Sequence, residues 1–164
     1  MAVEDLKGVY VMAMAGLVPA RAASFHHFDN PVKQLADRVA VPSGASIAST
    51  IELGQLKTSA VLSALGFVQF AALAASTTLK VGLKDDSNIA LTGKTALLNA
   101  ATSTASAGST AIGAAVALAD RYKPLWELAG FTADPGGVFT LVAELGGAAS
   151  TGGAVAWEIP FTSY

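Results

Sequence analysis

Apolar and polar side chains alternate along several short stretches of this chain. Such a two-residue period is typical of a β-strand that buries one face. The period is clearest over residues 77–83, 138–145 and 155–162. The faces expected to be buried carry the following residues: Thr77, Leu79, Val81 and Leu83; Phe139, Leu141, Ala143 and Leu145; Val155, Trp157, Ile159 and Phe161. Each of these three stretches therefore predicts a strand.

A fourth strand is predicted near residue 50, between two expected turns. Residues 39–41 lead into a turn at 42–44, which holds a proline and a glycine, and residues 54–59 are interpreted as a second turn. Between the turns the two faces of the strand carry different residues: Ile47, Ile51 and Leu53 on one, Thr50 and Glu52 on the other. This alternation fits one strand of a two-layer sandwich.

Residues 60–73 fit two different elements. Leu62, Leu65, Gln69 and Leu73 have the spacing of a helical stripe. The β-rich surroundings and a glycine within the segment favour one long strand or two short ones. Both interpretations stay open from the pattern alone.

The middle of the chain has weaker signals. Residues 85–88 are turn formers, and residues 89–99 predict one or two short strands around Thr92 and Gly93. Residues 100–113 are almost entirely Ala, Ser, Thr and Gly, which predicts a loop or a weakly specified edge strand. Residues 114–119 are expected to continue that segment.

Residues 123–130 interrupt the strand pattern and predict one short helical turn. Pro124 suits the first turn of a helix, because the missing N–H has no partner there, and Gly130 suits the C-terminal cap. We expect Leu125 and Trp126 to plug one end of the sheet structure. A buried anchor of this kind would compensate for the local irregularity. The alternative is that Trp126 is an exposed anchor of an interface.

Together these segments give about eight strands at short, regular spacing, which is typical of a β-sandwich or barrel. Strands and helices do not alternate along the chain, so the pattern does not predict a parallel sheet. Residues 1–35 lack a clean period, although residues 9–18 are apolar. We expect residues 1–35 to form an N-terminal arm along a neighbouring protein and residues 36–164 to form the sandwich domain. The alternative is that the first 35 residues are an ordinary strand and loop of that domain.

The composition points to a surface that another protein covers. Hydrophobic residues make up 52% of the 164 residues and charged residues only 13%, so little material is available for a fully solvated exterior. The alternative is a sequence that is merely rich in alanine. The net charge is −2 and the basic residues are scattered, which predicts no nucleic-acid partner. The chain has no cysteine and hence no disulfide.

Neither apolar run predicts a membrane segment. Residues 9–18 precede an Ala-Arg-Ala sequence that resembles a signal-peptide cleavage site, but the residues before the run are more acidic than basic. Residues 60–75 are short for a membrane span and contain Gln69. We expect no membrane partner.

No residue pattern predicts catalysis, cofactor binding or a metal site. His26 and His27 are adjacent, so on an extended chain they point in opposite directions. Asp85, Asp86 and Asn88 lack the glycine and glutamate of a calcium loop. No serine lies in a Gly-x-Ser-x-Gly elbow. We therefore expect a protein that is not an enzyme and has no catalytic, cofactor-binding or metal residues.

One family resemblance adds to this. Residues 123–161, KPLWELAGFTADPGGVFTLVAELGGAASTGGAVAWEIPF, resemble the last part of the small cement, or head decoration, proteins of tailed bacteriophages. That family has a KPLW-x-x-x-G-x-x-x-DP segment, then a strand, a small-residue turn and a final strand. Residues 41–56 and 76–86, and the opening MAVEDLKG, are also similar to it. The likeness covers most of the chain after Ala36 and is weak over residues 9–35.

The resemblance implies a jelly-roll β-sandwich and a structural role in the virion. A cement protein binds the major capsid protein on the outer surface of the phage head and stabilises the shell. The resemblance also implies self-association as a dimer or trimer at a capsid symmetry axis, and synthesis in the host cytoplasm. An alternative is a carbohydrate-binding jelly-roll module of a head fibre or tail appendage, which would use Trp157 or Tyr164. A jelly-roll enzyme of the cupin type would need clustered histidine and carboxylate ligands.

Overall fold

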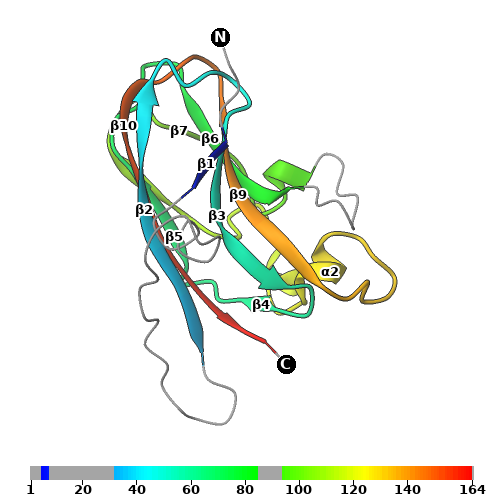
Figure 1. The fold of residues 1–164 in the computed structure, drawn as a ribbon. Coiled ribbons are helices and arrows are strands. Elements are labelled where there is room, and N and C mark those ends of the chain that lie inside the picture. The colour runs from blue at the N-terminus through cyan, green and yellow to red at the C-terminus, as the bar shows by residue number, and fades with distance from the viewer. Residues whose placement is uncertain (1–4, 8–31, 85–93, 164) are drawn as a thin grey trace, which may run out of the picture.

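The chain folds into short β-strands that form two sheets (Figure 1). The structure, a computed structural model, describes residues 5–7, 32–84 and 94–163. Ten strands and three short helices lie within these residues. Their bounds are β1 Asp5–Lys7, β2 Lys33–Ser43, β3 Thr50–Lys57, β4 Val61–Leu62, β5 Phe67–Phe70, β6 Thr78–Lys84, η1 Lys94–Ala96, β7 Asn99–Ser103, β8 Gly108–Ala111, η2 Leu118–Asp120, α2 Leu125–Leu128, β9 Val138–Gly146 and β10 Thr151–Thr162.

The strands are divided between two sheets that enclose the core. Sheet A has the order β1-β3-β9-β6-β7, and sheet B has the order β2-β10-β5-β8. The short β4 pairs with the end of β10 and so extends sheet B at one end of the molecule. Figure 1 shows β2, β5 and β10 on one side of the sandwich and β3, β6 and β9 on the other.

Four antiparallel strand pairs nest inside one another along the chain. β2 pairs with β10, β3 with β9, β5 with β8, and β6 with β7. Successive pairs alternate between sheet B and sheet A. A long hairpin rolled into two sheets in this way is a jelly roll. The predicted fold class, an antiparallel β-sandwich of jelly-roll type, is confirmed, and among the described strands only β1 pairs in parallel, with β3.

β3 continues through residues 54–57 of the turn predicted at 54–59, because Gly54 forms a bulge, and the chain turns only at residues 58–59. The pairing of β3 with β9 shifts register between Glu52 and Gly54 and then continues to the end of the strand. Gly54 has a φ of 146°, which only glycine adopts without strain. The inserted residue changes which positions face inward. Leu53 and Leu56 are therefore both buried, at 1% and 2% exposure, although they are three residues apart.

Ile47 does not share the buried face of β3, so that prediction is wrong. Ile51 and Leu53 are buried, but Ile47 lies before the strand and is 55% exposed. Ala48 has a φ of 67°, in the left-handed region that non-glycine residues adopt rarely. This bend breaks the alternation between residues 47 and 51.

Residues 60–73 form β4 and β5, so the two-strand interpretation is confirmed and the helical one is wrong. Residues 85–93 lie outside the described residues, and with them the expected turn at 85–88. Lys94–Ala96 is a 3-10 helix, η1, instead of the expected strand. Residues 100–113 contain most of β7 and all of β8, which are edge strands of sheets A and B, as one of the two interpretations predicted. Residues 114–119 do not continue them, because the chain turns there and enters η2.

The predicted helical turn before the last two strands is present as α2. Pro124 precedes it with a φ of −64°, and Gly130 follows it with a φ of 91°. The N–H groups of Leu125 and Trp126 donate hydrogen bonds to the carbonyl oxygens of Ala60 and Thr58, at 2.9 and 3.1 Å. Leu125 is fully buried, whereas Trp126 is only half-buried. Leu125 is therefore the residue that closes this end of the sandwich.

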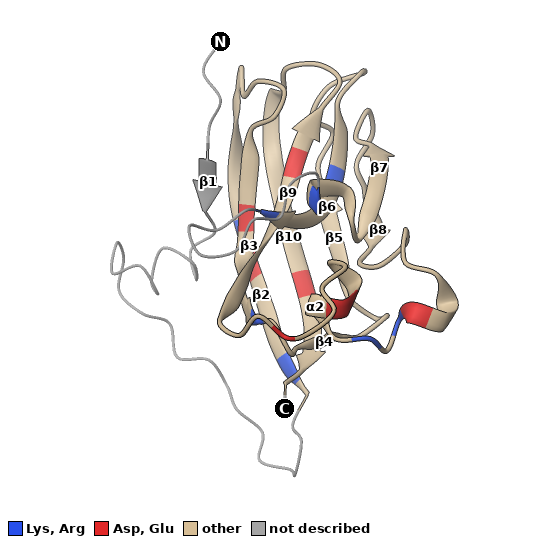
Figure 2. Cartoon of the chain, turned by 90° about the vertical axis from the view of Figure 1, so that its right-hand side faces the viewer, with Lys and Arg blue, Asp and Glu red and all other residues tan. Residues whose placement is uncertain are grey.

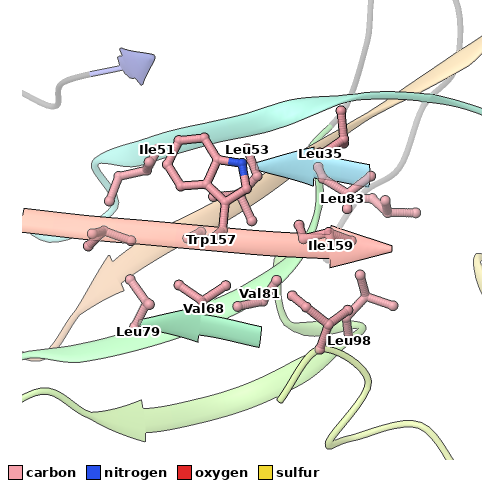
Figure 3. Packing of buried hydrophobic residues seen from close by; sticks show 14 of the residues in the cluster. Leu35, Ile51, Leu53, Val68, Leu79, Val81, Leu83, Leu98, Trp157 and Ile159 are labelled. Atoms are coloured by element: carbon pink, nitrogen blue, oxygen red, sulfur yellow. The ribbon is translucent and has the colours of Figure 1, made fainter. Parts of the chain in front are cut away.

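The core consists of the inward-facing residues of both sheets (Figure 3). Its larger fully buried residues include Ile51, Val68, Leu79, Leu83, Leu98, Phe139, Leu141, Leu145 and Ile159. Trp157 of β10 lies among them at 3% exposure. The three clearest sequence periods all supply residues to this core, which confirms the strands predicted from them.

The outer faces of the two sheets differ. On sheet A, Thr140 and Val142 of β9 are buried although they point away from the core. The short helix η1 covers this face and contacts β6 and β9. A Cβ on Gly82 would lie 2.0 Å from the carbonyl oxygen of Lys94, so η1 can approach β6 only because residue 82 is glycine. No comparable element lies over sheet B among the described residues, and its outward residues such as Arg38 and Gln69 are exposed.

Candidate interaction surface

The described residues contain no group of three or more histidine, cysteine, aspartate or glutamate side chains that could hold a metal ion. His26, His27, Asp85, Asp86 and Asn88 lie outside the described residues. No helix in the described ranges is long and apolar enough to cross a membrane. A candidate site on this molecule is therefore an interaction surface, which exposed apolar side chains mark.

Exposed apolar side chains gather at one end of the sandwich. Among the described residues, the exposed large hydrophobic side chains are Val32, Ile47, Leu65, Leu118, Tyr122 and, at 38%, Val138. Val32, Leu65, Leu118 and Tyr122 line the same groove, which has a volume of about 430 Å³. We call it the end groove. Single exposed apolar residues are common, but four around one hollow are not expected of a surface that faces only water.

Four segments far apart in the sequence form the end groove. Val32 precedes β2, Leu65 lies between β4 and β5, Leu118 begins η2, and Phe161 lies near the end of β10. β4 joins two of these segments, because Leu62 pairs with Phe161.

A tight turn at one wall directs Leu65 outward. The N–H of Leu65 donates to Ser63 Oγ at 3.3 Å, and the N–H of Gly66 donates to the Ser63 carbonyl at 3.2 Å. Leu65 is consequently 81% exposed.

The opposite wall is the segment from η2 to α2. The N–H of Asp120 donates to the carbonyl of Ala117, and the Asp120 carboxylate pairs with Lys123 Nζ at 2.8 Å. The hydrogen bond and the negative charge of Asp120 raise the pKa of Lys123. This compact turn presents Tyr122 at 85% exposure.

Tyr122 also borders a second groove. Its other lining residues include Val61, Pro124, Trp126 and Thr162. Trp126, which the sequence suggested as a buried plug, therefore contributes part of its indole to the surface beside Tyr122. The two grooves form one continuous apolar end of the molecule, because they share Val61, Tyr122 and Thr162.

Among the described residues, Arg121 is the only charged one that lines the end groove. Its Nε is buried and has no hydrogen-bond partner. A buried donor without a partner costs on the order of 1–3 kcal/mol, and more when the group is charged. Arg121 also lines the groove as a positively charged hydrogen-bond donor, so a carboxylate or carbonyl oxygen suits this position.

The outer face of sheet B is a second hollowed surface, of about 570 Å³. In the strand register, Arg38, Ala156, Gln69 and Ser109 form one row across its four strands. The other lining residues are small apart from Phe70, and include Ala71, Ala107, Gly108 and Ala154. Figure 2 shows that charged residues are sparse over both sheets.

Trp157 does not supply an exposed platform for a sugar, because it is 3% exposed and packs in the core. Its Nε1 is buried without a hydrogen-bond partner. Tyr164, the other aromatic residue considered for that role, lies outside the described residues. This removes the tryptophan from the carbohydrate-binding interpretation.

The chain matches no protein-family model and no curated protein. Among solved structures it is similar to a chain in "Capsid of Ralstonia phage GP4", with a TM-score of 0.61 and 15% identity over 96% of this chain and 97% of that chain. It is also similar to a chain in "Cyanophage Pam1 capsid asymmetric unit", with a TM-score of 0.55 and 19% identity over 89% of this chain and 95% of that one. The likeness is one of fold. At these identities it assigns the jelly roll to a fold present in phage capsids and carries no residue-level role.

Proposed function

We propose that this protein is a structural component of a phage virion, and specifically a cement protein that binds the outer surface of the head. The observation that carries the proposal is the end-to-end fold match. The chain aligns over 96% of its own length and 97% of the length of a chain in a phage capsid. The match therefore extends over nearly the whole of both chains and is not confined to one part of either.

The surface supports a role in association. Only 13% of the residues are charged, and four exposed apolar side chains line the end groove. Such surfaces mark sites where proteins meet. We propose that the partner is the major capsid protein and that copies of this chain also associate with one another at a symmetry axis of the shell.

The proposed activity is mechanical and involves no catalysis. A protein that binds the assembled shell but not its dissociated subunits stabilises the assembly by mass action, by about 2.7 kcal/mol per site at a free concentration of 100 times Kd. Residues 1–35, expected to act as an arm, would extend this attachment along a neighbouring subunit. Within this segment the structure describes β1 (Asp5–Lys7), which pairs with β3 in sheet A, and β2 begins at Lys33.

The proposal is tested with phage heads assembled without this chain. Purified protein is mixed with these heads, and the complex is separated by sedimentation. We expect saturable binding at a fixed ratio to the capsid subunits and a rise in the temperature at which the heads release DNA. Unassembled capsid subunits serve as the control and should bind weakly. Absence of binding to intact heads, or binding that leaves the release temperature unchanged, would contradict a cement function.

A further inference from the structure

The end groove combines two features that each call for a partner. Its rim carries Val32, Leu65, Leu118 and Tyr122, which are between 65% and 85% exposed. Arg121 lines the groove and also a smaller cavity, and its buried Nε has no hydrogen-bond partner among the described residues. An apolar surface alone would bind any apolar side chain. The positively charged arginine favours an occupant that also carries a hydrogen-bond acceptor.

The volume indicates a groove for a peptide segment. At about 430 Å³ it falls within the ~300–1,000 Å³ typical of pockets that take a small ligand or a few side chains. The β4–β5 turn and the η2 segment form its two walls, and the end of β10 lies between them. A hollow of this size, lined by several separate segments, accommodates a few side chains of a short extended segment.

The charge of the lining disfavours a second copy of this chain pressed groove to groove. Arg121 is the only charged lining residue in the part of the chain that the structure describes, so a two-fold contact would bring two guanidinium groups into one apolar interface without an anion. The nearest carboxylate along the chain, that of Asp120, already pairs with Lys123 at 2.8 Å. Burying two like charges is strongly unfavourable.

The outer face of sheet B has no comparable feature that selects a ligand. Its hollow is lined mostly by small residues, and Arg38 and Gln69 are exposed to water. No polar atom on this face is both buried and unsatisfied. The end groove is therefore the surface for which the structure specifies an occupant.

We propose that the end groove binds an extended segment of the shell protein that carries a carboxylate next to bulky apolar side chains. The carboxylate accepts hydrogen bonds from the Arg121 guanidinium, and the apolar side chains pack between Leu65, Leu118 and Tyr122. Arginine is suited to this role because its planar group holds a carboxylate in a fixed orientation. The identity of the partner as the shell protein rests on the proposed function.

The first experiment locates the occupant. The full chain carries p-benzoylphenylalanine in place of Leu65 and is bound to heads assembled without the chain, then irradiated. Ile47 takes the same substitution as a control, because it is also exposed but lies before the start of β3 and does not line the groove. We expect position 65 to cross-link to a shell-protein segment that has Asp or Glu within a few residues of a bulky apolar residue, and position 47 not to reach that segment. Cross-links from position 65 only to residues 8–31 of this chain, only to a second copy, or to nothing would overturn the inference.

The second experiment tests the charge pairing. Arg121→Gln and Tyr122→Ser should each weaken head binding by about tenfold or more, because each removes a central contact. Ile47→Ser should leave binding within about twofold, as expected of a surface change away from the contact. Replacing the cross-linked shell carboxylate by its amide should weaken binding as Arg121→Gln does, with no further loss when both changes are present. The melting temperature of each variant establishes that it is folded.

The results separate this inference from the proposed function. If the wild-type chain does not bind heads, the cement function itself fails. If the wild-type chain binds and both Arg121→Gln and Tyr122→Ser bind equally well, the cement function stands and the role of the end groove is wrong.

Discussion

The end groove and the outer face of sheet B are both hollowed, but water solvates their lining residues to different degrees. The face is the larger hollow, about 570 Å³ against about 430 Å³. Most of its lining residues are small, and its polar side chains are exposed, so water can solvate it. The groove has large exposed apolar side chains and a buried arginine nitrogen without a partner. What distinguishes an interaction site is therefore the free-energy cost of exposing its surface to water without a partner, and not the volume of its hollow.

The largest expected effect comes from the residue that supports the groove. Leu125 is fully buried at the end of the sandwich, and its N–H bonds to Ala60. Leu125→Ala should lower the free energy of unfolding by about 2–5 kcal/mol, the usual cost of such a cavity. Denaturant titration of the isolated protein measures this.

Trp126→Ala is the matched comparison for Leu125→Ala. Trp126 is only half-buried and borders the second groove, so its truncation should destabilise the fold less than Leu125→Ala. A larger loss for Trp126→Ala would show that the indole, and not Leu125, closes this end.

A second prediction compares two glycines, Gly82 on the outer face of sheet A and Gly108 in the edge strand β8 of sheet B. A Cβ on Gly82 would lie 2.0 Å from a backbone oxygen of η1, whereas a Cβ on Gly108 would meet only the ring of Phe70 at 3.4 Å. Gly82→Ala should therefore lower the unfolding free energy by about 1–3 kcal/mol or more, as overpacking does. Gly108→Ala should change it by less than about 0.5 kcal/mol. Equal melting temperatures for the two variants would mean that η1 does not cover sheet A tightly.

The sequence pattern predicted the strands best where one face alone is buried. Val155, Trp157 and Ile159 of β10 show the period that the core requires, and they are buried, whereas Ala156 and Glu158 between them are not. The pattern failed where a local feature changed the period. Gly54 suggests a turn but forms a bulge, and the turn at Ala48 separates Ile47 from the strand.

The burial of Val142 and the position of the end groove could not be predicted from periodicity. Val142 points away from the core and is buried because η1 packs over sheet A. The rim of the groove comes from segments that meet only in the folded chain, with Val32, Leu65 and Tyr122 each in a different one. The low content of charged residues predicted that a partner covers part of the surface. Composition does not say which part of the surface that is.

A third prediction concerns residues 1–31. Because β2 begins at Lys33, a chain that starts at Val32 keeps nine of the ten described strands, all but β1. We expect it to retain its β-sheet circular dichroism and to bind heads more weakly than the full chain. Loss of the β-sheet signal would show that the removed residues belong to the core.

The smallest effect is expected on the outer face of sheet B. Ala156 lies in the middle of its central row, between Arg38 and Gln69. Ala156→Gln should change the unfolding free energy by no more than about 0.5 kcal/mol and should leave head binding unchanged. If Ala156→Gln abolished head binding while Tyr122→Ser did not, the assignment of the two surfaces would be reversed.

The central claim is that this chain is attached to the outside of a phage head. Electron cryomicroscopy of heads with and without the protein tests it most directly, through the difference between the two maps. The account predicts added density on the outer surface into which the jelly roll fits, with the end groove against the shell and the outer face of sheet B toward solvent. Identical maps at saturating protein would contradict the claim.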